Sequence, residues 1–230
     1  MKTLLIAAND TGAGKTRVTG ALAGMFAAYG HAVQIVKLVE TGVAPGATGD
    51  ADAAAALARE TASLFGQKPR VTAHTLFSFT QPLTPTVAAN RDRKPFGKAL
   101  LREALAALPD DGADFRILET AGGLAVPVDA DGADWADFAR EIAPDVTVLV
   151  LEDRLGSISQ ARLVAAYAKS KDVPNAGFWL NAAKPIADDL RAIHRTHLAP
   201  TGLPVLADTA HGDTAPRLPA GSPLTALFTA

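Results

Sequence analysis

The sequence predicts an α/β fold in which one doubly wound, mainly parallel sheet carries helices on both faces. Short apolar runs alternate with stretches of helical periodicity along most of the chain, and this alternation favours parallel strands joined by right-handed crossovers. A Gly-rich segment follows the first apolar run and opens a helical pattern. No Pro- or Gly-rich linker divides the 230 residues, so residues 1–230 are predicted to form a single domain.

The individual elements follow from the same patterns. Apolar runs bounded by turn residues are typical of strands covered on both faces, and they occur at 4–8, 31–38, 115–119, 145–152, 176–181 and 203–207. Helical spacing of apolar residues occurs at 16–29, 52–64, 98–108, 135–142, 158–169 and 186–197. The Pro- and Thr-rich stretch 69–86 and the tail 210–224 are predicted to be irregular.

Composition excludes several classes of protein. Apolar residues make up 48% of the chain and charged residues 20%, which is typical of a globular domain. A net charge of −2 favours neither nucleic acid nor an anionic membrane as partner. The absence of cysteine excludes disulfides and thiolate chemistry. No secretory or membrane-spanning segment is recognisable, so we expect a soluble cytoplasmic protein.

The segment 7–18, AANDTGAGKTRV, lies between the first predicted strand and its helix. Backbone N–H groups of such a loop can close round phosphate oxygens at the helix N-terminus. Lys15 can reach the β- and γ-phosphates, and the Thr16 hydroxyl can hold Mg²⁺. The glycine that usually opens this loop is replaced by Asn9. We therefore predict a variant phosphate loop of the P-loop NTPase type, with ATP and Mg²⁺ as cofactors and nucleotide contacts from Gly12, Ala13, Gly14, Lys15, Thr16 and Arg17.

Three charged residues elsewhere complete the predicted site. Lys37 stands near the end of the second predicted strand, where it can neutralise charge on a transferred phosphoryl group. Glu119 closes the apolar run FRILE, a common place for a carboxylate that holds Mg²⁺. Asp52 offers a further carboxylate, although a helix N-cap alone would explain it. Whether Asp50 or Asp52 meets the metal stays open.

These segments together resemble one family. The series NDTGAGKT, KLVETG, DADAAAAL, QPLTPTVAA, LETAGGLAVPV, ADWA and RLGSISQARL, in order from Met1 to about Asn181, is similar to dethiobiotin synthetase, an ATP-dependent carboxylase of the biotin pathway. The resemblance implies that CO₂ adds to one amine of 7,8-diaminononanoate to give a carbamate. ATP then phosphorylates the carbamate, and the second amine closes a cyclic urea with loss of phosphate.

The resemblance also implies roles for individual residues. Lys15, Lys37 and Thr11 would surround the γ-phosphate and carbamate, and Asn181 would read the nucleotide base. Thr16, Asp52 and Glu119 would hold Mg²⁺. The substrate would meet Thr41, Gly122, Gly123 and Ser159. The family is dimeric, so the segment 155–160 would face the substrate of the neighbouring subunit.

The chain departs from the family pattern at several positions. Gly12 replaces a glutamate and Ser159 replaces an asparagine that anchors the substrate's carboxylate, which leaves the identity of the amine open. A Gly-x-x-Pro turn that contacts the base is absent from VLADTAHGD, which leaves the base preference open. The family's usual residues are also replaced at Ala8, Leu38 and Thr120.

Two alternatives to dethiobiotin synthesis remain at this point. One is a diverged relative that carboxylates another amine or forms an amide. The other is a switch ATPase of the ParA or MinD kind, although Asp10 occupies the position of the signature lysine of those proteins. His194 and His197 lie three apart on a predicted helix, and we expect surface residues rather than a metal site. Trp135 and Trp179 are expected in the core.

Overall fold

Seven strands hydrogen-bond in the order β3–β2–β4–β1–β5–β6–β7, and every named pair is parallel. The computed structural model describes residues 1–44 and 46–228. The strands are β1 (Lys2–Ala8), β2 (Ala32–Thr41), β3 (Arg70–Phe79), β4 (Phe115–Glu119), β5 (Val146–Glu152), β6 (Ala176–Asn181) and β7 (Val205–Thr209). The central position of β1, with β4 and β5 on its two sides, makes this a doubly wound sheet and confirms the predicted fold class.

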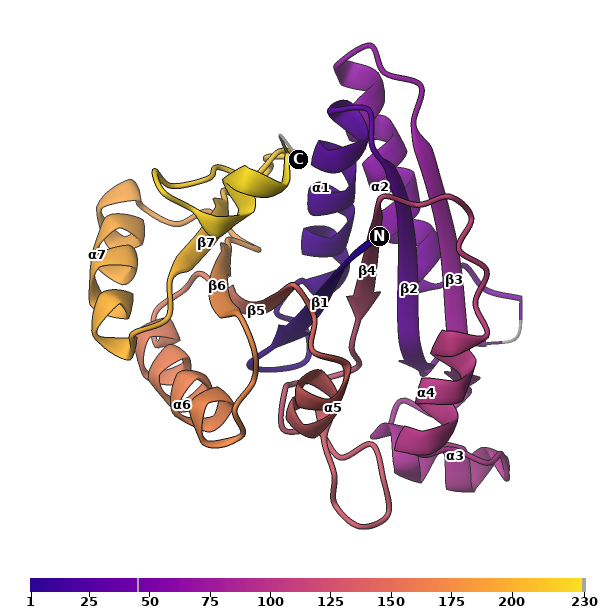
Figure 1. Ribbon diagram of the computed structural model, residues 1–230. Coiled ribbons are helices and arrows are strands. Elements are labelled where there is room, and N and C mark those ends of the chain that lie inside the picture. Colours follow the sequence, from indigo (N-terminus) through magenta and orange to yellow (C-terminus); the bar gives the residue numbers. More distant parts are fainter. Residues whose placement is uncertain (45, 229–230) are drawn as a thin grey trace.

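Helices cover both faces of the sheet (Figure 1). One hydrophobic core joins the sheet to α1 (Lys15–Ala28), α2 (Asp50–Leu64) and the short C-terminal helix η2 (Pro223–Leu227). The opposite core contains residues of α3 (Pro85–Asp92), α4 (Lys98–Ala106), α5 (Trp135–Ile142), α6 (Ser157–Ser170) and α7 (Asp188–Leu198). The short 3-10 helix η1 (Ala199–Thr201) follows α7.

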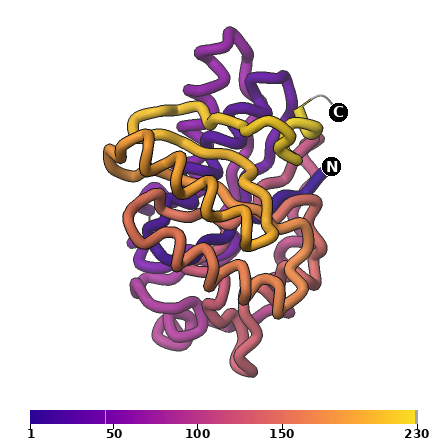
Figure 2. The backbone as a smooth tube through the Cα atoms, turned by 90° about the vertical axis from the view of Figure 1, so that its left-hand side faces the viewer, coloured from indigo at the N-terminus to yellow at the C-terminus, as the bar shows by residue number. Residues whose placement is uncertain are grey.

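The two ends of the sheet are built differently. Figure 2 views the molecule from the β7 side, where α6 and α7 lie side by side beneath the chain that follows β7. Both β3 and β7 are edge strands, but β7 also carries an isolated antiparallel bridge between Asp208 and Arg217, whereas β3 pairs only with β2. Among the described residues, no helix combines the length and the apolar character that a membrane crossing requires.

Two elements and several boundaries differ from the sequence prediction. The prediction of irregular structure over 69–86 is wrong, because β3 occupies Arg70–Phe79 and α3 begins at Pro85. As an edge strand, β3 has four exposed positions and only two fully buried ones, so it lacks the continuous apolar run of a central strand. The second strand does not end near Lys37 but continues to Thr41, and α2 begins at Asp50 rather than at Asp52.

Candidate active site

The carboxyl ends of β1, β2 and β4 meet around a cavity of about 330 Å³. Ligands of doubly wound sheets bind at this edge. Residues of the loop between β1 and α1 form one wall, and the ends of β2 and β4 and the start of α2 form the others. The lining residues are Thr11, Gly12, Gly14, Lys15, Thr16, Lys37, Val39, Glu40, Thr41, Val43, Asp50, Glu119, Ala121 and Gly122.

The phosphate loop ends in a tightly constrained residue, Gly14, which caps α1. Its φ of +95° lies in the left-handed region, and a Cβ at this position would overlap the side-chain amide of Asn181. Asn181 is buried at the end of β6, and its Nδ2 donates to the Ala13 carbonyl at 3.0 Å. Glycine is therefore required for both backbone conformation and space, and the loop is fixed to the end of β6.

Lys15 points toward the β4 side of the cavity. The side chain is buried, and Nζ donates to the Gly122 carbonyl at 2.8 Å. Burial, followed by repulsion from Lys37, lowers the pKa of Lys15 to about 8. A neutral carbonyl does little to balance the charge of this ammonium group, so a bound anion would stabilise its protonated form.

Glu119 is the centre of the polar cluster at the floor of the cavity. Its Oε1 accepts hydrogen bonds from the Thr16 hydroxyl at 2.9 Å and from Lys37 Nζ at 2.6 Å. Lys37 Nζ also lies 2.6 Å from Asp50 Oδ2. Burial alone would lower the pKa of Lys37, but the two carboxylates outweigh that effect and raise it. Lys37 is therefore held protonated inside the site.

The structure brings Asp50, rather than Asp52, to the cavity. Asp50 lies in the first turn of α2, and its backbone N–H donates to the Glu40 carboxylate. Asp52 is exposed and is not among the lining residues, because a shift of two positions on a helix turns a side chain by about 200°. Glu40 is buried and lines the cavity. Sequence reasoning missed it, although the motif KLVETG contains it.

The donor set around Glu119 fits a Mg²⁺ ion. Thr16, Glu119 and Asp50 provide the hydroxyl and carboxylate oxygens that this ion prefers, with further ligands left to phosphate and water. Glu119 Oε2 is buried and has no hydrogen-bond partner in the described part of the chain, so one oxygen remains available. No cluster of three or more His, Cys, Asp or Glu able to hold a metal occurs among the described residues.

A second cavity of about 230 Å³ continues from the first. The two share Thr11, Thr41, Ala121 and Gly122. The Ala121 carbonyl is fixed by a 2.7 Å hydrogen bond from the indole N–H of Trp135. The outer wall is formed by Pro82, Leu83, Thr84, Pro85 and Val126. Residues 82–85 belong to the stretch that sequence reasoning treated as irregular, and they were missed as part of the site.

Three predicted ligand residues occupy other positions. Gly123 faces the backbone of the phosphate loop, because its missing Cβ would lie 2.8 Å from the Asn9 carbonyl. Ser159 is exposed on α6 and does not line either cavity. Arg17 directs its guanidinium to the carbonyls of Ala182, Ala210 and Asp213 rather than into the cavity.

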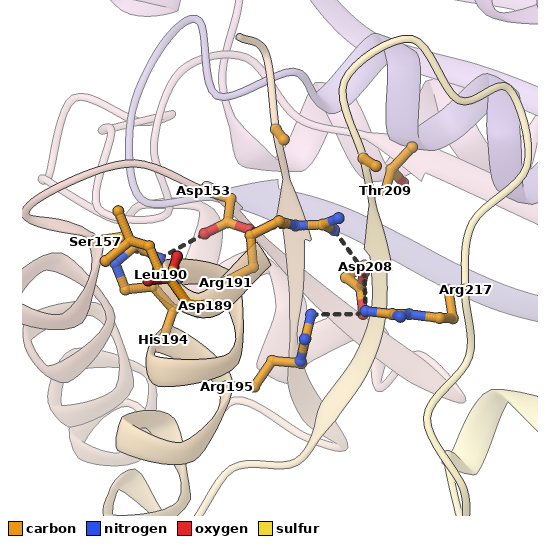
Figure 3. A network of polar contacts seen from close by, with 12 residues as sticks. Asp153, Ser157, Asp189, Leu190, Arg191, His194, Arg195, Asp208, Thr209 and Arg217 are labelled. Carbon is orange, nitrogen blue, oxygen red and sulfur yellow. Dashed lines mark hydrogen bonds and ion pairs between the residues drawn. The ribbon is translucent and has the colours of Figure 1, made fainter. Parts of the chain in front are cut away.

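A separate buried network joins Asp153, the residue after β5, to α7 and β7 (Figure 3). Arg191 bridges Asp153 at 3.1 Å and Asp208 at 2.6 Å, and His194 lies 2.6 Å from Asp153. The prediction that His194 is a surface residue is therefore wrong, whereas His197 is exposed as expected.

Both tryptophans are fully buried, which confirms their prediction as core residues. The indole of Trp179 donates to the hydroxyl of Thr209 at 2.8 Å.

Comparison with known proteins gives one family. The model of an AAA domain family matches residues 2–209. The ATP-dependent dethiobiotin synthetase of Saccharopolyspora erythraea is 35% identical over 218 residues, which cover 94% of this chain and 90% of that protein. The enzyme of Streptomyces coelicolor is 34% identical and covers 84% and 76% of the two chains. That of Frankia casuarinae is 36% identical over 166 residues, which cover 71% of this chain and 64% of that protein.

Solved structures agree on the fold. The signal recognition particle 54 kDa protein of Aeropyrum pernix, in complex with GDP, superimposes with a TM-score of 0.55 at 19% identity, covering 99% of this chain and 46% of that one. The MinC:MinD complex of Aquifex aeolicus gives 0.53 at 13% identity, with coverage of 100% and 85%. At these identities the likeness concerns the architecture alone.

Proposed function

The chain belongs to the dethiobiotin synthetase family of ATP-dependent ligases, and from this premise we propose that it converts 7,8-diaminononanoate, CO₂ and ATP to dethiobiotin. Lys37 is the observation that supports the proposal best. It is a second buried lysine beside the phosphate loop, held protonated by Glu119 and Asp50 at the floor of the cavity. A cation in that position is suited to a substrate that carries negative charge next to the γ-phosphate.

The proposed reaction has three steps. One amine nitrogen adds to CO₂ and loses a proton, giving a carbamate. A carbamate oxygen attacks the γ-phosphorus and ADP leaves, giving a carbamic-phosphoric anhydride. The second amine then attacks the carbonyl carbon, phosphate leaves, and loss of a proton completes the cyclic urea. Since phosphate is a good leaving group, the enzyme's task is to position the reactants and to balance charge.

The chain's own groups can be assigned to these tasks. Lys15 would meet the β- and γ-phosphates, and Lys37 would lie between the γ-phosphate and the carbamate. Thr11 and Thr41 line both cavities, so their hydroxyls would meet the reacting end of the diamine. Mg²⁺, held by Thr16, Glu119 and Asp50, would neutralise phosphate charge.

The nucleotide base would be recognised on the β6 side of the phosphate loop, where Asn181 lies. Asn181 uses Nδ2 for the Ala13 carbonyl, and its Oδ1 is buried without a partner in the described residues. A free amide oxygen accepts hydrogen bonds. It is therefore complementary to a base with an exocyclic amino group, such as adenine.

A homodimer is part of the proposal. Leu155, two residues before α6, and Leu163, in the middle of that helix, have exposed fractions of 81% and 70%. They lie on either side of Ser159 in the sequence, and Ser159 is exposed in the first turn of α6. Covering these side chains with a second subunit would remove apolar surface from water. It would also bring Ser159 to the neighbour's substrate, which explains its distance from the cavities of its own chain.

The proposal is tested by mass spectrometry of reactions that contain only the purified chain, ATP, Mg²⁺, ¹³C-bicarbonate and a diamine. We expect 7,8-diaminononanoate to gain one labelled CO₂ with loss of one water. A diamine without the carboxylate tail should react more slowly. ADP release without a carboxylated product would contradict the proposal and favour a switch ATPase. Turnover of a different amine or a carboxylate would favour the diverged relative.

A further inference from the structure

Arg17 joins the phosphate-loop helix to two loops on the far side of Asn181. Its Nη1 donates to the Ala182 carbonyl at 3.2 Å, just after β6. Its Nη2 donates to the Ala210 and Asp213 carbonyls at 3.0 and 2.6 Å, just after β7. All three acceptors are backbone groups, so the guanidinium fixes the course of the main chain in both loops.

The segment after β7 is a closed turn. The Asp213 N–H donates to the Ala210 carbonyl at 3.2 Å, and Gly212 has a φ of +86°, as required at the third position of a type II turn. Asp208 and Arg217 exchange backbone hydrogen bonds of 2.9 and 2.8 Å at the base of the segment. Arg17 therefore holds the tip of a segment whose base is already fixed.

The two loops also contact each other. The Ala182 N–H donates to the Thr209 carbonyl at 3.0 Å, and His211 Nδ1 lies 3.0 Å from the Ala183 carbonyl. Asn181 immediately precedes the first loop and touches the phosphate loop. A nucleotide with its phosphates on that loop has the catalytic cavity on one side. Asn181 and these loops form the β6 side of the phosphate loop, which is available to the base.

We propose that Arg17 is a positioning residue that gives the site its preference for a nucleotide base. It would hold the Ala182 loop and the 210–213 turn where they, together with Asn181, meet the base. Lys15, two positions earlier, would hold the phosphates. The planar guanidinium can serve three carbonyls in fixed directions, which an ammonium group cannot. The inference rests on the proposed function only for the presence of a nucleotide.

The experiment compares ligands with and without a base. Calorimetry would give the affinities of ATP, GTP and inorganic tripolyphosphate for the wild type, Arg17→Met and Arg17→Lys, with Arg162→Met as a control at an exposed arginine of α6. We expect Arg17→Met to weaken ATP binding about tenfold while tripolyphosphate binding changes less than twofold. Arg17→Lys should give a smaller loss, and the control none. Hydrogen exchange at 182–183 and 211–213 should accelerate in Arg17→Met without nucleotide.

Equal losses for ATP and tripolyphosphate would overturn the inference, because Arg17 would then act on the phosphates. Unchanged ATP affinity in a folded variant, or unchanged ATP preference over GTP, would overturn it as well. So would a wild type that binds ATP no better than tripolyphosphate. None of these outcomes decides whether a diamine is carboxylated, which the mass-spectrometric assay measures separately.

Discussion

Two clusters of buried charge lie at the same edge of the sheet and differ in how completely they are paired. In the cavity cluster, Lys15 meets only a backbone carbonyl, and Glu119 Oε2 has no partner in the described structure. In the β5–β7 network, both carboxylate oxygens of Asp153 and of Asp208 face an arginine or histidine. The first cluster borders a cavity of about 330 Å³. The second borders none of the cavities described above.

The difference distinguishes a binding site from a scaffold. Buried polar groups are almost always satisfied, so an unpaired carboxylate oxygen and a weakly balanced ammonium group indicate groups that await a ligand. The charges of a fully paired network need no ligand to balance them. Removal of one member leaves another charge buried without its partner. We therefore expect substitutions in the cavity cluster to affect chemistry and substitutions in the network to affect stability.

The largest effect is expected for Lys15→Ala. Loss of a positioned cation beside the γ-phosphate should reduce turnover on the order of 10³-fold. The thermal unfolding midpoint should not fall, because burial already disfavours the charged form of Lys15. Steady-state kinetics and calorimetric unfolding measure the two quantities, with Lys68→Ala as an exposed control. Turnover close to that of the wild type would remove Lys15 from the phosphate site.

A smaller effect, on stability rather than on turnover, is expected for Asp208→Ala. Arg191 would lose its 2.6 Å partner while remaining buried, so the free energy of unfolding should fall by about 3 kcal/mol. Urea titration measures this loss, and kcat should change less than threefold. The control Asp188→Ala lies at an exposed position in the first turn of α7, the helix that carries Arg191. It should lower the free energy of unfolding by less than about 1 kcal/mol. Equal losses for the two variants would contradict a structural role for the network.

The smallest expected effect is the uptake of less than one proton when a nucleotide binds. The pKa of Lys15 is lowered to about 8 by burial and by Lys37, so near pH 8 about half of the free protein carries a neutral Lys15. Bound phosphate favours the charged form and raises this pKa, so nucleotide binding should take up protons at pH 8 and almost none at pH 6.5. Calorimetry in buffers of different ionisation enthalpy measures the uptake. Lys15→Arg, which is always charged, should show none. Proton release at pH 8 would contradict this sign.

The fold was largely predictable because its central strands are buried on both faces. Continuous apolar runs mark β1, β4, β5 and β6 in the sequence. The edge strand β3 was missed because exposed positions interrupt its apolar residues, although the alternate spacing of Val71, Phe77 and Phe79 is a local signal of a strand with one exposed face. The extension of β2 beyond Lys37 was missed for a related reason, because Glu40 is a charged residue that the structure buries.

The site was predictable where chemistry is tied to local sequence. Lys15, Thr16, Lys37 and Glu119 were predicted from their places after strands, and the structure brings all four to one cavity. The sequence left open whether Asp50 or Asp52 reaches the site, because the start of a helix cannot be located to better than one or two residues from its pattern, and the structure brings Asp50 to the cavity. The burial of His194 depends on Asp153, 41 positions away, and no local pattern reports such a pair.

The most direct test concerns Lys37, since the proposed function assigns it to both the γ-phosphate and the carbamate. Nucleotide affinity and incorporation of ¹³C-bicarbonate into the diamine should be measured for the wild type, Lys37→Ala and the control Lys68→Ala. We predict that Lys37→Ala retains nucleotide binding, because Lys15 and the backbone N–H groups of the loop remain, and loses incorporation by more than about 10²-fold. Full incorporation by a folded Lys37→Ala protein, or loss of nucleotide binding in parallel with incorporation, would contradict the role assigned to the cavity cluster.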